Sequence, residues 1–82
     1  MSSDVNSIIS ALSELEQDST VPRNIKEKIQ KTIETLQGSG EMSMKIDKVL
    51  ADIDEIADDI NLQAYTRTQI WNIVSMLEKI EN

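Results

Sequence analysis

The sequence predicts an all-α protein, an up-down-up-down four-helix bundle built from two similar helical hairpins. Apolar residues recur at three- and four-residue steps in four segments, the period of one face of a helix. The breaks between these segments are short, and short connections make sequential helices antiparallel neighbours. None of the segments shows the strict alternation of a strand. We therefore expect one four-helix domain over residues 1–82.

The four helices are expected at about residues 4–17, 22–37, 42–58 and 63–80. The first break is DSTVP at 18–22, where Pro22 lacks an N–H and suits the first turn of a new helix. Gly38-Ser39-Gly40 ends the second helix and makes a glycine available for a left-handed closing residue. Residues 59–62 form the last break, ahead of the helix with the only tryptophan, Trp71.

The chain repeats itself weakly at an offset of 41 residues. At the two breaks, Asp18 aligns with Asp59 and Thr20 with Asn61. The apolar positions of the helices align at the same offset, which any two amphipathic helices can be phased to do. The matching lengths and break positions are the stronger evidence, and they indicate two hairpins joined at residues 38–40.

The composition excludes several classes of site. Without His or Cys, the chain lacks the commonest general base, the strongest nucleophile and most zinc or haem ligands. With two glycines, it can form neither a P-loop nor a dinucleotide-binding fingerprint. We therefore expect no enzyme, no catalytic residues, no cofactor and no metal centre.

Charge and hydropathy indicate a soluble cytoplasmic protein. The formal net charge of −7 argues against broad affinity for nucleic acid or anionic lipid. No apolar run approaches the roughly 20 residues that span a bilayer, so no membrane association is expected. The amino-terminal MSSDVNS has neither a basic region nor an apolar segment, and it therefore predicts no secretory signal.

Three stretches of the sequence carry a resemblance to a known family. VPRNI at 21–25, LADIDEIADD at 50–59 and TRTQIWNIVSMLE at 66–78 resemble uncharacterised protein family 0147, a group of small archaeal proteins. The resemblance covers roughly residues 12–80, with TRTxIWN as its most specific part, whereas GSGEMSMK at 38–45 departs from the pattern. It implies an archaeal cytoplasmic origin and a small all-helical fold, and it assigns no activity.

Two charged clusters are candidate sites. Asp52, Glu55 and Asp59 share a helix face and could hold a hard cation, although the solvated side of a helix is the favoured interpretation. The second cluster is a basic patch that could contact nucleic acid, dock onto the acidic third helix, or be ordinary surface charge: Arg23, Lys26, Lys28 and Lys31.

The last helix supplies the other candidate. Arg67 and Trp71 are four residues apart, so the guanidinium can lie over the indole as a cation–π pair. Trp71 is interpreted first as core or core rim, and alternatively as a partner anchor, since Trp and Arg dominate binding hot spots. Arg23 joins them as a binding candidate, because the starts of the second and fourth helices are expected at the same end of the bundle.

The preferred hypothesis is a non-enzymatic protein-interaction or assembly module that binds a protein partner or self-associates. The first alternative is a small RNA- or ribosome-associated accessory protein that uses the basic patch. The second is a carboxylate-dependent binder of a divalent metal.

Overall fold

The computed structural model describes the backbone of residues 2–81 and the side chains of residues 4–80. It contains four α-helices: α1 (Ser2–Gln17), α2 (Arg23–Gln37), α3 (Met42–Ala57) and α4 (Ala64–Glu81). The four predicted helices are confirmed, and α1 begins two residues earlier than expected. Within residues 2–81, no helix is both long enough and apolar enough to cross a membrane.

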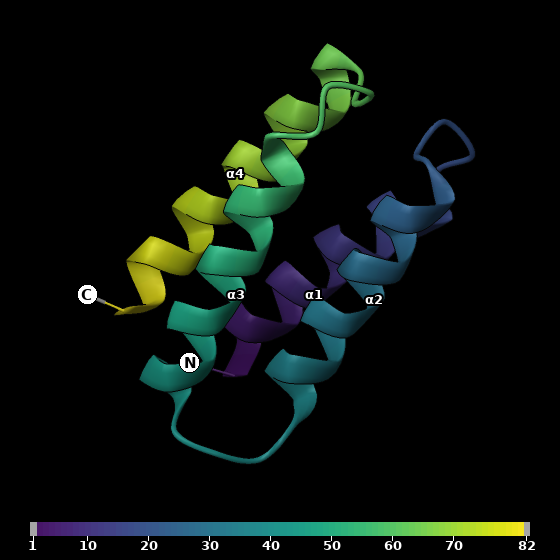
Figure 1. Cartoon of the computed structure of the whole chain (residues 1–82). Coiled ribbons are helices and arrows are strands. Elements are labelled where there is room, and N and C mark those ends of the chain that lie inside the picture. Colours follow the sequence, from purple (N-terminus) through teal and green to yellow (C-terminus); the bar gives the residue numbers. More distant parts are fainter. Residues whose placement is uncertain (1, 82) are drawn as a thin grey trace.

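The helices run up and down in chain order and form a bundle about 32 Å long and 20 Å across (Figure 1). Each helix packs on two others, in the order α1–α2–α3–α4 and back to α1. Within the described residues, the diagonal pairs α1–α3 and α2–α4 make no contact. The α1–α2 and α3–α4 loops therefore share one end of the bundle, opposite the α2–α3 linker.

The core is almost entirely aliphatic and draws on all four helices. The side chains at its centre are at most 2% exposed, and they include Ile8, Ile29, Ile53 and Leu77. Because isoleucine is stiff at χ1, a core dominated by isoleucine loses little rotamer freedom on burial. The buried residues of the cluster are Ile8, Leu12, Leu15, Val21, Ile25, Ile29, Ile33, Leu36, Ile46, Val49, Ile53, Ile56, Ala57, Leu62, Ile70, Ile73 and Leu77.

The repeat predicted at an offset of 41 residues is confirmed in the hydrogen bonds of the two hairpin loops. The carboxylate of Asp18 accepts from the backbone N–H of Thr20 at 2.9 Å, and that of Asp59 accepts from the N–H of Asn61 at 2.8 Å. The backbone bonds that surround them match one for one: Asp18 to Leu15, Val21 to Asp18 and Lys26 to Pro22 in the first loop, and Asp59 to Ile56, Leu62 to Asp59 and Arg67 to Gln63 in the second. The two hairpins therefore share one local design.

The linker between the hairpins differs from its prediction. Gly38 caps α2 in an extended conformation (φ −75°, ψ 178°), so the expected left-handed closing residue is wrong at this position. The positive φ occurs at Gly40 (121°), within the linker. The end of α2 is instead satisfied by Lys45 of α3, whose Nζ donates to the carbonyls of Leu36 (3.2 Å) and Gly38 (2.8 Å).

Candidate functional site

Large apolar side chains reach the surface only in the second half of the part that the structure describes. Ile60 is 90% exposed, Tyr65 is 65% exposed and Trp71 is 47% exposed, and Met42 and Met44 are also exposed. Among the described side chains of the first hairpin, no large apolar residue is exposed. Exposed apolar side chains that gather in one region indicate a contact surface rather than a requirement of the fold.

Trp71 lies on the side of α4 that faces α3. It follows Arg67 by four residues, so the two share a face, and Arg67 reaches the end of α3. Trp71 is seven residues into α4 and Leu50 is seven residues before the end of α3, which places them at the same level of the two antiparallel helices. The interpretation of Trp71 as a core residue is therefore wrong, because the indole lies half-exposed at the outer edge of the α3–α4 pair.

Arg67 has a structural role at the end of α3. Its Nε donates to the carbonyl of Ala57 at 3.2 Å and its Nη2 donates to the carbonyl of Asp59 at 2.9 Å. These carbonyls belong to the last turn of α3 and the loop, where intrahelical partners run out. The contacts that the structure gives Arg67 are thus with backbone oxygens, and not with the indole of Trp71.

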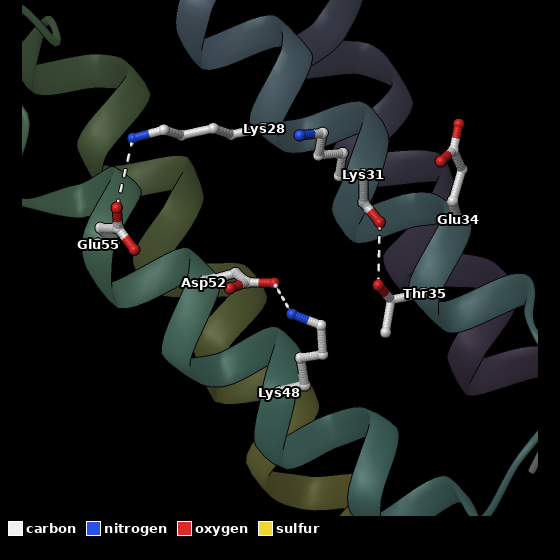
Figure 2. Close-up of a pocket in the computed structure, with 7 residues that line it drawn as sticks. All are labelled: Lys28, Lys31, Glu34, Thr35, Lys48, Asp52 and Glu55. Atoms are coloured by element: carbon white, nitrogen blue, oxygen red, sulfur yellow. Dashed lines mark hydrogen bonds and ion pairs between the residues drawn. The ribbon is translucent and has the colours of Figure 1, made fainter.

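The predicted basic patch is divided between the two sides of α2. Lys28 and Lys31 line a groove of about 540 Å³ between α2 and α3, together with Lys48. Figure 2 shows Lys28 reaching across to Glu55 of α3, with its Nζ 3.6 Å from the carboxylate. The predicted docking of this patch onto the acidic third helix is confirmed for Lys28.

Arg23 and Lys26 line a second groove, of about 670 Å³, between α1 and α2. Lys31 also borders this groove, and three carboxylates share its walls: Glu16, Glu27 and Glu34. Each basic side chain therefore has acidic neighbours, and the four do not form one continuous basic surface. Such a surface is what phosphate backbones require of a protein.

The acidic candidates are not assembled into a cation site. Asp52 pairs with Lys48 at 3.4 Å, Glu55 pairs with Lys28, and Asp59 accepts from the N–H of Asn61 in its loop. Among the described side chains, no three carboxylates are grouped closely enough to hold a metal ion. Since a hard cation needs several converging oxygens, this geometry does not support the metal-binding alternative.

Arg23 and Arg67 both lie at the loop end of the bundle, as predicted. They belong to α2 and α4, which are diagonal helices without contact, and Arg23 is exposed whereas Arg67 is half-buried. In the first loop, the two hydrogen bonds from Thr20 and the charge of Lys26 hold the pKa of Asp18 below its usual value of 3.8. Lys26 thus stands beside Asp18 as Arg67 stands beside Asp59, the equivalent position at the offset of 41.

Ile60 and Tyr65 are surface residues that the sequence reasoning missed. A signal for them was present in the repeat, because a position that is polar in one copy and apolar in the other is a candidate surface contact. The residues of the first hairpin that align with the three exposed ones, Ile60, Tyr65 and Trp71, are Ser19, Asn24 and Gln30.

Comparison with known proteins gives relatives along nearly the whole chain. The UPF0147 protein MJ1419 of Methanocaldococcus jannaschii is 41% identical over 71 residues, covering 85% of this chain and 76% of that protein. The UPF0147 protein PF0239 of Pyrococcus furiosus is 38% identical over 79 residues, covering 94% of this chain and 85% of that protein.

Two solved structures have the same fold. The crystal structure of MMP1188, a protein of unknown function, matches with a TM-score of 0.90 at 38% identity, over 96% of this chain and 91% of that one. A UPF0147 protein from Thermoplasma acidophilum matches with a TM-score of 0.90 at 34% identity, over 96% and 94%. The model of the uncharacterised protein family UPF0147 matches residues 1–80. The chain belongs to this family.

Proposed function

We propose that the chain is a non-enzymatic protein-interaction module that binds a partner through the outer surface of α4 and the loop before it. The observation that carries this proposal is the difference between two hairpins of the same design. Only the second places Ile60, Tyr65 and Trp71 in solvent, at positions where the first has polar residues. Folding explains neither choice, since both hairpins bury the same helix faces.

The kind of residue also favours a partner. Tyr and Trp bring large apolar area with few rotatable bonds, and they dominate the energetics of protein interfaces. Trp71 is half-buried already, so little rotamer freedom remains to be lost when a partner covers it. The basic patch offers no comparable support for RNA binding, because Lys28 is ion-paired and carboxylates lie among the other basic side chains.

Tyr65→Asn/Trp71→Gln tests this proposal, because it gives the second hairpin the residues of the first. The matched control is Asn24→Ala/Gln30→Ala, which alters the aligned positions of the first hairpin. Each is used as bait in extract from an archaeal relative, with and without nuclease. A captured protein is then purified and its binding to each variant is measured directly.

We expect a purified partner that binds the wild type and the control equally, survives nuclease, and binds Tyr65→Asn/Trp71→Gln at least tenfold more weakly. Retention that disappears with nuclease and falls steeply with salt would favour the basic-patch alternative instead. A partner that binds both variants as tightly as the wild type would refute the proposed surface. Circular dichroism establishes that all variants are folded.

A further inference from the structure

The surroundings of Trp71 identify the chemistry of the partner. Leu50 lies at the level of the indole, and Asp47 and Asp54 follow Leu50 on the same face of α3 by three and four residues in either direction. Glu78 lies two turns along α4 from Trp71, on the same side. Asp58 ends α3 on this side. We call these four carboxylates the acidic rim: Asp47, Asp54, Asp58 and Glu78.

The acidic rim has no internal partner. All four side chains are exposed, and none takes part in the ion pairs or hydrogen bonds of the described residues. The other carboxylates of α3 differ, because Asp52 and Glu55 face α2 and are paired with lysines there. The unpaired negative charge of the second hairpin is thus gathered around the one half-exposed indole.

The first hairpin shows that this charge is not required by the fold. At the offset of 41 residues the acidic rim aligns with uncharged residues, and Trp71 aligns with Gln30; the four aligned residues are Asn6, Ser13, Gln17 and Gln37. Gln17 and Gln30 line the outer groove of α1 and α2, which supports the placement of Asp58 and Trp71 in the corresponding groove of α3 and α4. One groove is neutral and the other is acidic and aromatic, on the same backbone.

We propose that the α3–α4 groove binds a cationic protein segment that carries lysine or arginine beside an apolar residue. This inference rests on the proposed function and adds the class of partner. The apolar residue packs on Trp71 and Leu50, and the cations pair with Asp47 and Asp54, where the indole face also attracts them. The net charge of −7 opposes a nucleic acid, an anionic membrane or a second copy on the same surface.

Synthetic amphipathic peptides test this partner class, with Trp71 as a built-in reporter because it is the only tryptophan. The probes are a Lys/Leu peptide, a Glu/Leu peptide with the same apolar positions, and a Lys/Ser peptide. We expect saturable binding of the Lys/Leu peptide with a shift of the emission to shorter wavelength, and no such shift with the other two. Equal response to the Glu/Leu or Lys/Ser peptide, or no response to the Lys/Leu peptide, would overturn the inference.

Two charge variants locate the binding. Asp47→Asn/Asp54→Asn removes two carboxylates of the acidic rim, and Glu27→Gln/Glu34→Gln removes the same charge from α2. We expect about fivefold weaker binding of the Lys/Leu peptide to the first variant and a change below about twofold for the second. Equal weakening by both would mean unspecific attraction to an acidic protein and would overturn the inference. For Trp71→Gln, a dye on the peptide replaces the lost reporter, and we expect a larger loss than for either charge variant.

The two proposals fail in different ways. If a natural partner depends on Trp71 but binds Asp47→Asn/Asp54→Asn as tightly as the wild type, the interaction module stands and the cationic partner is wrong. If the natural partner is insensitive to Trp71 as well, the interaction surface itself is wrong.

Discussion

The two hairpins of this bundle have the same backbone design and opposite surfaces. Both turn through an aspartate that accepts from the N–H two residues on, and both bury the same aliphatic faces. On the outside, the first hairpin presents polar and mixed-charge side chains, whereas the second presents Ile60, Tyr65 and Trp71 with the acidic rim beside the indole. The interior is constrained by packing, while the exterior is free to differ, and the difference marks where a function has been added.

The loops show the same separation on a smaller scale. A cation stands at the start of the second helix of each hairpin, Lys26 in the first and Arg67 in the second. Arg67 donates two hydrogen bonds to the carbonyls that follow α3, whereas the effect of Lys26 on its loop is electrostatic, through the carboxylate of Asp18. An ammonium acts as a compact charge, and a guanidinium can satisfy two oxygens at once.

The largest expected effect tests whether the two cores are equivalent. Leu12 and Ile53 align at the offset of 41 and are 2% and 1% exposed, so truncation of either leaves a cavity in the same layer of the bundle. We expect Leu12→Ala and Ile53→Ala each to lower the free energy of unfolding by about 2–5 kcal/mol. Urea denaturation followed by circular dichroism measures both. A loss confined to one hairpin would show that the repeat does not extend to its energetics.

A smaller effect should separate the two loop cations. Arg67→Ala leaves the carbonyls of Ala57 and Asp59 without their donor and is expected to cost about 1–2 kcal/mol of stability. Lys26→Ala, the matched change in the first hairpin, should cost less than about 0.5 kcal/mol, because Lys26 acts only through an exposed charge. Thermal unfolding of both variants checks this, and equal losses would contradict the distinct roles assigned to them.

The smallest effect concerns the pH dependence of the first loop. The pKa of Asp18 is lowered mainly by the side-chain hydrogen bond from Thr20, so Thr20→Val should raise this pKa toward 3.8. Because the folded pKa lies below the unfolded one, the stability that Asp18 contributes is present above the unfolded pKa and is lost as pH falls through the folded pKa. Titration of the carboxyl carbon by NMR measures the shift, and an unchanged pKa in Thr20→Val would refute the assigned cause.

Much of the fold could be predicted because it depends on local signals. The four helices, their order and the equivalence of the loops follow from apolar periodicity, from Pro22 and from the repeated aspartates. The closing of α2 could not be predicted in this way, since the residue that satisfies its end, Lys45, comes from the next helix. A glycine next to a helix end signals only that a left-handed closing residue is available there.

The candidate site was predicted in part. Trp71 was identified from the sequence, but its first interpretation as core was wrong, and Ile60 and Tyr65 were not singled out. The basic patch looked continuous along the sequence, yet a helix turns by about 100° per residue, so its members face α1 on one side and α3 on the other.

The sequence by itself determined the helices, the faces that they bury, the hairpin repeat and the chemistry that the chain lacks. The tertiary structure decided which charges are paired, that Arg67 serves the end of α3, and that Trp71 stands half-exposed beside unpaired carboxylates. The physical reason is that periodicity fixes the direction of a side chain around its own helix. What lies in that direction, whether a second helix or solvent, depends on how the helices are arranged around the core.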